Sequence, residues 1–323
     1  MQLDKGILTI SLDFELIWGT LDLFGPERFR RQCEIEREQV VDRLLDLLDE
    51  FHISATWCVV GHLFLDHCIE HDGHKHPNIV RPQHSWCKQD WFYHDPCEAR
   101  EGKSIFLGRS LVEKIVVCAT PQEIGCHSFS HVIFGDAGCS RETAESEIAA
   151  CVELARDMGI KLHSFAFPRN RVGHLDVLRD YGFSCYRGPD SDPYQQLPKL
   201  RILRRLAHLW DVLTAKEPPI VFPEKKNFEL WNVPGSMIYF PIHGLRRFIP
   251  VSRRVKRAIK GLEAAAREKG VFHLWFHPTN LSDQSDAMFA GLRMIFQHAS
   301  QLREDGKITI APMRAFGLAD VPA

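Results

Sequence analysis

The chain has 323 residues, of which 45% are hydrophobic and 25% are charged, and its formal net charge is −2. This composition is typical of a globular protein and does not suggest a nucleic acid or an acidic polymer as partner. The length suits one large α/β domain or two ordinary ones. The apolar run after Lys5 is too short for a signal peptide, and no window is apolar enough to cross a bilayer, so we expect a soluble cytoplasmic protein.

Ten cysteines are scattered along the chain without a close Cys-x-x-Cys pair. In a cytoplasmic protein of this size we expect them to be free thiols. Cys87 and Cys97 flank one irregular segment, and a disulfide or metal site there is the alternative.

The chain begins with a predicted buried strand, Ile7–Leu12, followed by a helix, Glu34–Phe51, and a second strand, Ile53–Val60. This order predicts a βαβ unit and a parallel sheet. Asp13 and Glu15 follow the first strand two residues apart, so an extended backbone points both side chains the same way. Two carboxylates so placed repel each other unless a cation or a shared proton lies between them.

A segment from about residue 62 to 108 interrupts the alternation. A loop this long inside a compact domain is usually functional or disordered. Its aromatic residues, Trp86 and Trp91 among them, predict an ordered lid or a wall for a sugar, and a loop with its own small core is the alternative. Six histidines lie here, and we interpret them as mostly solvated rather than as a metal site: His67, His71, His74, His76, His84 and His94.

The alternation resumes after this insertion. We expect helices at 110–119, 140–158, 174–181, 201–213, 251–269 and 283–304, and strands at 123–126, 163–167, 183–186, 271–276 and 307–311. No linker or repeat is evident, which predicts one α/β barrel-like domain over residues 1–323. The amphipathic helix at 201–213 is expected to pack on the domain, with a membrane surface or lipid-linked substrate as the alternative.

Polar side chains follow several predicted strands at their carboxyl ends, where parallel α/β barrels build their sites. His127 and His131 follow one strand, His277 follows another, and Arg169 closely follows a third. Histidines four residues apart face the same way on a helical turn and form a ready pair for a divalent metal ion. With a carboxylate in reach they predict a two-histidine, one-carboxylate site that suits zinc or another transition metal.

The arrangement resembles the polysaccharide deacetylase family, also called the NodB-homology or carbohydrate esterase family 4 fold. The resemblance extends from residue 7 to about 281 and implies a distorted (β/α) barrel. Its motifs are Ser11-Leu12-Asp13-Phe14-Glu15, Ala55-Thr56-Trp57, His127-Ser128-Phe129-Ser130-His131, Phe167-Pro168-Arg169-Asn170 and Leu274-Trp275-Phe276-His277. The first motif departs from the family's usual adjacent Asp-Asp pair, and the Phe167-Pro168-Arg169-Asn170 motif is degenerate.

The resemblance implies a role for each residue of these motifs. Glu15 is the metal ligand beside the two histidines, and Asp13 is the general base, although the reverse assignment stays open. Arg169 is our choice for the arginine that orients Asp13, with Arg171 second. His277 is the general acid. Substrate contacts are expected from Trp86, Trp91 and Trp275.

These roles predict a hydrolase of carbon–nitrogen bonds that uses one divalent metal ion, and zinc is the ion we expect. We expect it to remove an N-acyl group, acetyl or formyl, from an amino sugar or a glycan precursor linked to a nucleotide or lipid. Lipopolysaccharide or other surface-glycan biosynthesis is a plausible extension. The alternatives are a hydrolase of a non-sugar or cyclic amide, and a non-catalytic glycan-binding protein on the same fold.

Overall fold

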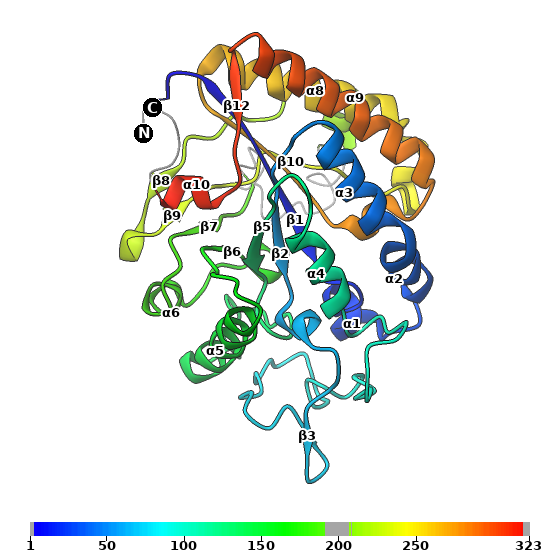
Figure 1. Ribbon diagram of the computed structural model, residues 1–323, viewed down its shortest axis with the longest axis vertical. Coiled ribbons are helices and arrows are strands. Elements are labelled where there is room, and N and C mark those ends of the chain that lie inside the picture. The colour runs from blue at the N-terminus through cyan, green and yellow to red at the C-terminus, as the bar shows by residue number, and fades with distance from the viewer. Residues whose placement is uncertain (1–2, 191–206, 208, 319–323) are drawn as a thin grey trace.

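The computed structural model describes residues 3–190, 207 and 209–318 (Figure 1). Within them, ten strands form one sheet in the order β10-β11-β1-β2-β5-β6-β7-β9-β8, and β12 pairs with β1 in addition. The strands are β1 (Gly6–Phe14), β2 (Thr56–Val59), β5 (Glu123–Cys126), β6 (Ser164–Ala166), β7 (Cys185–Arg187), β8 (Glu224–Lys225), β9 (Trp231–Asn232), β10 (Met237–Ile238), β11 (Val271–Phe276) and β12 (Ile308–Ile310). Every pairing along this sheet is parallel except that of β8 with β9.

The first strand, β1, is the centre of this sheet. All nine of its residues are buried, as expected of a parallel strand that is covered on both faces. It lies between β11 and β2, and its first residues also pair with β12. The sheet curls into a half-barrel, which confirms the predicted α/β fold of the distorted-barrel type. The prediction of one domain over the whole chain stays a prediction.

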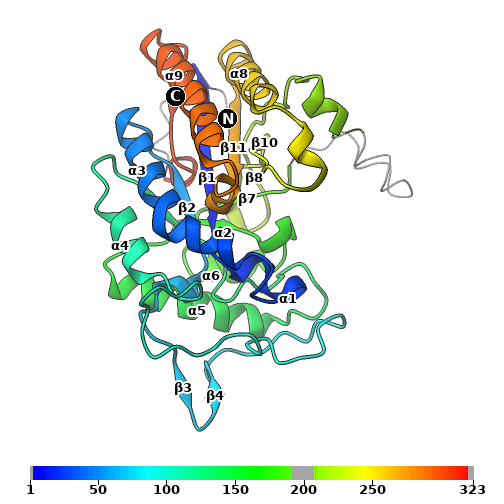
Figure 2. The same cartoon turned by 90° about the vertical axis from the view of Figure 1, so that its right-hand side faces the viewer.

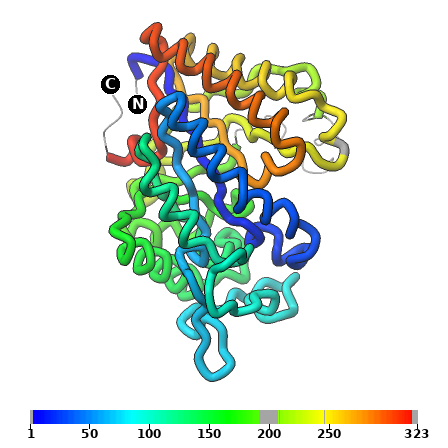
Figure 3. The backbone as a smooth tube through the Cα atoms, turned by 45° about the vertical axis from the view of Figure 1, so that its right-hand side comes forward, coloured from blue at the N-terminus to red at the C-terminus, as the bar shows by residue number. Residues whose placement is uncertain are grey.

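Helices surround the sheet (Figures 1 and 3). They are α1 (Trp18–Phe24), α2 (Arg30–Ile35), α3 (Val41–Glu50), α4 (Arg109–Val116), α5 (Arg141–Asp157), α6 (Leu175–Asp180), α8 (Val251–Glu268), α9 (Ser285–Glu304) and α10 (Arg314–Gly317). A π-helical turn, Glu36–Val40, joins α2 to α3, and short 3₁₀ turns occur at Gly61–Phe64, Pro168–Asn170, Asn227–Glu229, Gly244–Phe248 and Pro278–Leu281. Most of the helix predicted at 201–213 lies outside the described residues. None of the helices that the structure describes is long and apolar enough to cross a membrane.

The insertion at residues 62–108 extends from one end of the sheet. Its regular structure is a small antiparallel hairpin, β3 (Glu70–His71) and β4 (His74–Lys75), which projects at the bottom of Figure 2. Apart from the 3₁₀ turn at its start the rest is irregular, but Phe92 and Phe106 are buried and join the main core. The expectation of free thiols is wrong for two residues, because Cys68 forms a disulfide with Cys97.

The expectation of mostly solvated histidines in the insertion is also wrong in part. His76 and His84 are buried, whereas His67, His71 and His74 are exposed. Burial removes water from a polar ring, so each buried imidazole needs partners within the protein.

Candidate metal centre and catalytic groups

The carboxyl ends of strands β11, β1 and β5 bring the predicted polar residues together. Asp13 lies near the end of β1 and Glu15 follows it directly, while His127 follows β5 and His277 follows β11. Since β11, β1, β2 and β5 are consecutive in the sheet, these ends meet at one edge. Phe14 points the other way and packs on Trp57, with ring centroids 5.7 Å apart, as the alternation of side chains along a strand requires.

Glu15, His127 and His131 form a compact buried group. The Nε2 atoms of both histidines lie 3.3 Å from Glu15 Oε2, and the three ligand-type atoms lie within 4.8 Å of one another. Burial would raise the pKa of Glu15, but the charges of His277 and His131 hold it well below its usual range. Glu15 therefore stays ionised.

The backbone fixes the direction of these imidazoles. His127 Nδ1 lies 2.8 Å from the Ala166 carbonyl oxygen and donates to it, which leaves a lone pair on Nε2. The turn between the histidines is held from α5, because Glu147 accepts hydrogen bonds from the backbone N–H and the hydroxyl of Ser130 at 2.8 and 2.6 Å. Burial raises the pKa of Glu147 to about 7.

The donor set fits a divalent cation. Glu15 Oε2 is buried without a hydrogen-bond partner among the described residues, although both imidazole Nε2 atoms face it. A buried carboxylate oxygen left in this way is costly unless a positive charge satisfies it. Two imidazoles and one carboxylate are ligands that zinc and related ions accept, and three protein ligands leave a position open for substrate or water.

Asp13 has different partners from Glu15. Its Oδ2 accepts a hydrogen bond from Arg187 Nη2 at 2.6 Å, and both side chains are almost fully buried. Burial would raise the pKa of Asp13, but the Arg187 charge, and after it those of His127 and His277, lower it. Asp13 is therefore a carboxylate held by an arginine. It lies next to the group formed by Glu15, His127 and His131 but is not part of it.

Arg187 was not singled out in the sequence, and it belongs to a buried network. Its Nη1 donates to Ser11 Oγ at 3.0 Å, and Ser11 Oγ lies 2.8 Å from His273 Nε2. His273 Nδ1 lies 3.1 Å from the carbonyl oxygens of Val233 and Pro234. Burial and the charge of Arg187 lower the pKa of His273 to about 3, so a neutral imidazole accepts from Ser11 and leaves the hydroxyl oxygen for Arg187.

The expected contact between Arg169 and Asp13 is wrong. Arg169 Nη2 pairs with the Asp22 carboxylate on α1, 2.6 Å from its Oδ1, and its guanidinium lies 5.7 Å from the Trp86 ring. Arg171, the second choice, pairs with Asp136 at 2.9 Å. Arg169 lies in the 3₁₀ turn after β6 and Arg171 directly follows that turn, whereas Arg187 is the last residue of β7 and is buried. A strand-end position, the signal that identified the other residues, would also have identified Arg187.

His277 lies between the two carboxylates and is partly open to solvent. Its Nε2 is 3.5 Å from Glu15 Oε1 and 3.7 Å from Asp13 Oδ2. The side chain is 28% exposed, in contrast to 4% for Asp13 and 7% for Glu15. His277 is therefore the most exposed of these three side chains.

The three predicted substrate-binding tryptophans lie in different settings. Trp86 is 41% exposed and stacks on His84. Trp91 is half-buried and donates from Nε1 to Ser130, within the turn between the metal-type histidines. Trp275 is buried, its Nε1 donates to Asp190 at 2.9 Å, and its ring lies 5.9 Å from that of His277.

Residues 25–183 match the family model for polysaccharide deacetylases. Nearly half of the chain therefore matches the polysaccharide deacetylase family. The matched region includes His127 and His131, whereas Asp13, Glu15 and His277 lie outside it. A search of curated protein sequences gave no match.

Several solved structures share the fold along nearly the whole chain. One named as a polysaccharide deacetylase from Mycobacterium smegmatis is 14% identical, with 98% of this chain and 91% of that chain covered and a TM-score of 0.62. Another from Pseudomonas aeruginosa PAO1 is 10% identical, with coverages of 97% and 89% and a TM-score of 0.57. The allantoinase PuuE is 11% identical, with coverages of 95% and 87% and a TM-score of 0.57. At these identities the likeness concerns the fold alone.

Proposed function

We propose that this protein is a metal-dependent hydrolase of carbon–nitrogen bonds that removes an N-acyl group, acetyl or formyl, from an amino sugar or a sugar-containing glycan precursor. The match of residues 25–183 to the polysaccharide deacetylase family model supports a sugar substrate. The observation that carries the mechanism is the separation of the two carboxylates. Glu15 faces two histidines and Asp13 faces an arginine, while both lie beside His277.

Glu15, His127 and His131 are the proposed ligands of one divalent ion, and zinc is the proposed ion because it suits nitrogen and oxygen donors. When bound, such an ion polarises a carbonyl group and lowers the pKa of water. The assignment of Glu15 rather than Asp13 rests on their contacts, since Glu15 Oε2 lies 3.3 Å from both imidazoles.

Asp13 is the proposed general base. The Arg187 charge lowers its pKa, so the carboxylate is ready to accept the proton of an attacking water. Arg187 acts by positioning Asp13, because it holds Oδ2 at 2.6 Å and leaves Oδ1 without a partner among the described residues.

His277 is the proposed general acid. An amine leaves poorly from a tetrahedral centre until its nitrogen is protonated, and His277 can deliver that proton from Nε2 at the solvent side of the carboxylates. Its partial exposure supports this role, because a leaving amine would depart on the solvent side. Protonation of that nitrogen and cleavage of the C–N bond yield a free amine and a carboxylic acid.

The tryptophans of the insertion support a sugar-binding wall. Trp86 offers an exposed ring above Arg169, and Trp91 links the insertion to the turn between the histidines. Trp275 borders His277 and is the third proposed substrate contact. A nucleotide- or lipid-linked precursor in the cytoplasm, and a place in lipopolysaccharide biosynthesis, are the finer parts of the proposal.

A second candidate is a hydrolase of a non-sugar amide, because one structural neighbour is named an allantoinase. A third, a glycan-binding protein, would bind without turnover, but base- and acid-type residues are both placed at the site.

The test is release of acetate or formate from a panel of N-acylated amino sugars, free and nucleotide- or lipid-linked, with cyclic amides as the comparison. We expect release only from the sugars, loss of release on chelation, and recovery with zinc. The variant His131→Ala should not recover. Turnover of cyclic amides alone would replace the sugar proposal with the second candidate, and turnover that resists chelation would contradict the role of the metal.

A further inference from the structure

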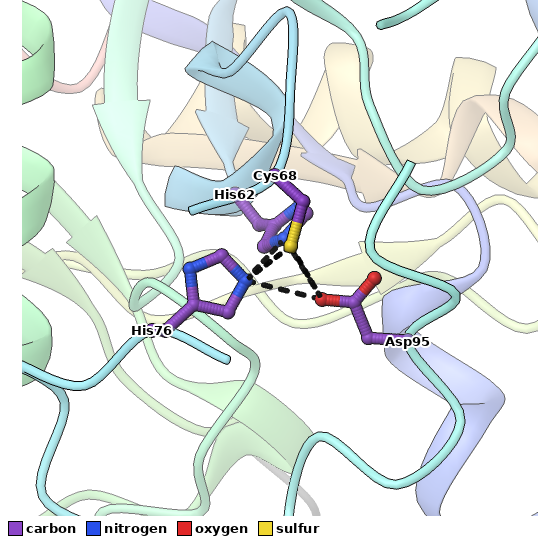
Figure 4. A group of neighbouring side chains, drawn as sticks. All are labelled: His62, Cys68, His76 and Asp95. Carbon is purple, nitrogen blue, oxygen red and sulfur yellow. Dashed lines mark hydrogen bonds and ion pairs between the residues drawn. The ribbon is translucent and has the colours of Figure 1, made fainter. Parts of the chain in front are cut away.

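A second cluster of metal-ligating side chains lies in the insertion. Figure 4 shows His62, Cys68, His76 and Asp95 directed at a common point from four separate segments of the chain. His62 belongs to the 3₁₀ turn after β2, Cys68 and His76 flank the β3–β4 hairpin, and Asp95 comes from the far part of the insertion. The cluster was not predicted, because these residues are widely spaced and His62 precedes the histidine-rich stretch.

The distances within the cluster suit a tetrahedral site. His62 Nε2 lies 3.0 Å from His76 Nε2 and 3.3 Å from Asp95 Oδ2. The distance between His76 Nε2 and Asp95 Oδ2 is 3.1 Å. Cys68 Sγ lies 3.6 Å from His76 Nε2 and 3.8 Å from Asp95 Oδ2. A tetrahedral zinc ion with bonds of about 2.0–2.3 Å keeps its ligand atoms roughly 3.3–3.7 Å apart.

His62 and Asp95 each use their second polar atom in a hydrogen bond to the backbone, and this bond orients the side chain toward the cluster. His62 Nδ1 lies 3.0 Å from the Phe106 carbonyl oxygen and donates to it, so Nε2 offers a lone pair. Asp95 Oδ1 accepts from the Cys97 backbone N–H at 2.9 Å, so Oδ2 faces the cluster. Such outer hydrogen bonds are what orient metal ligands.

Hydrogen bonding alone satisfies the cluster poorly. His62, His76 and Asp95 are almost fully buried. If His76 carries its proton on Nε2, that single hydrogen faces both His62 Nε2 and Asp95 Oδ2, while His76 Nδ1 has no partner among the described residues. A cation at the common point would satisfy the lone pairs of both Nε2 atoms and the carboxylate together.

We propose that the insertion holds a second divalent metal ion of the zinc class, bound by His62, His76, Asp95 and the thiolate of Cys68. In the structure Cys68 is bonded to Cys97, and a disulfide sulfur is not the thiolate ligand that zinc prefers. The four-ligand site therefore belongs to the reduced protein. A phosphine reductant opens the disulfide by taking oxygen from water to become the phosphine oxide, which leaves two thiols. Cys68 then releases its proton on binding the ion.

The ion would hold the insertion against the first metal centre. The backbone N–H of His62 donates to the Phe129 carbonyl oxygen at 2.8 Å, and Phe129 lies between His127 and His131 in the chain. The Phe129 ring also packs on the rings of His62 and His76, with centroids 5.6 and 5.3 Å apart. Four protein ligands leave no open position, so the ion is structural.

Metal stoichiometry tests the proposal without reference to activity. The full chain is reduced with a phosphine under nitrogen, dialysed against zinc, freed of excess and analysed for metal. We expect two ions per chain in the wild type, one in His131→Ala, one in His76→Ala and none in the double variant. A wild-type chain that binds one ion, which His76→Ala retains, would overturn the second site. A wild-type chain that binds one ion, which His131→Ala retains and His76→Ala loses, would support the second site and contradict the proposed first one.

A matched pair of cysteine variants identifies the sulfur. Cys68→Ser and Cys97→Ser both abolish the disulfide, but only the first removes the proposed ligand. After cobalt(II) substitution, we expect a thiolate-to-cobalt charge-transfer band in Cys97→Ser and none in Cys68→Ser. The first metal centre has no sulfur ligand and gives no such band. Equal bands in the two variants, or no band in either, would overturn the assignment of Cys68.

Discussion

The two clusters of metal-ligating residues differ less in their ligands than in their surroundings. Each has two histidines and one carboxylate. Glu15, His127 and His131 lie beside Asp13 and the partly exposed His277, whereas the cluster of the insertion adds a fourth ligand-type atom from Cys68. An open position with an acid and a base nearby favours catalysis, and a closed set of four favours structure. The neighbours of a metal therefore decide its role.

The largest expected effect separates Asp13 from Asp95. Asp13→Asn should lower turnover by about 10²- to 10⁴-fold, because the variant side chain cannot accept the proton, and it should retain its metal. Asp95→Asn should instead reduce the metal content of the reduced protein by one ion. Kinetics and metal analysis on the same samples check both. Loss of metal from Asp13→Asn would place Asp13 among the ligands.

The next effect separates two arginines. Arg187→Met removes the charge that lowers the pKa of Asp13, so the acid limb of the pH–rate profile should move to higher pH. It also leaves a buried carboxylate unpaired, which costs about 3–5 kcal/mol of stability. Arg169→Met is the control, since Arg169 pairs with Asp22. A shift of the acid limb in Arg169→Met, and none in Arg187→Met, would restore the original prediction.

A glycine beside Glu15 tests the fit of the first centre. A Cβ at Gly19 would lie only 1.7 Å from Glu15 Oε1, so Gly19→Ala must displace that carboxylate. We expect metal affinity to fall by about 10- to 100-fold, the loss typical when a ligand is misplaced. Thr20→Ala, at the next position of α1, is the control, and zinc titration measures both. Unchanged affinity in Gly19→Ala would show that Glu15 does not hold the ion.

A separate effect, on stability rather than on turnover or metal affinity, concerns Glu36, a buried carboxyl in the π-helical turn. Burial raises its pKa from 4.5 to about 8, and it accepts a hydrogen bond from Thr279 at 2.8 Å. Between these pH values the folded protein retains a proton that the unfolded chain has lost, so stability falls as pH rises from about 4.5 to about 8. The contribution is on the order of 3–5 kcal/mol.

Glu36→Gln, which is neutral at every pH, should lose that part of the pH dependence. Glu38→Gln, on the exposed side of the same turn, should keep it. Urea unfolding at several pH values provides the measurement. Parallel pH profiles for wild type and Glu36→Gln would contradict the raised pKa.

The sequence was sufficient for the parts of the site that strand ends determine. Asp13, Glu15, His127 and His277 each lie at or just after the end of a strand that its apolar residues reveal, and a parallel sheet brings such ends together. Arg187 occupies an equivalent position after Tyr186. The degenerate Phe167-Pro168-Arg169-Asn170 motif instead favoured Arg169 as the partner of Asp13.

The boundaries of the insertion could be predicted from the sequence, but the contacts within it could not. Its lack of periodicity marked residues 62–108 as a separate segment, yet the pairing of Cys68 with Cys97 and the convergence of His62, His76 and Asp95 depend on tertiary contacts. No local spacing encodes them. The disulfide also bears on the predicted cytoplasmic location, because the cytoplasm keeps thiols reduced.

The division of labour between the two carboxylates of β1 is the central claim, and anomalous diffraction at the zinc edge tests it most directly. In crystals of the wild-type protein grown with zinc, we predict an anomalous peak between Glu15 Oε2, His127 Nε2 and His131 Nε2. Asp13 should still accept its hydrogen bond from Arg187. A peak within bonding distance of Asp13, or none beside His127 and His131, would contradict the account.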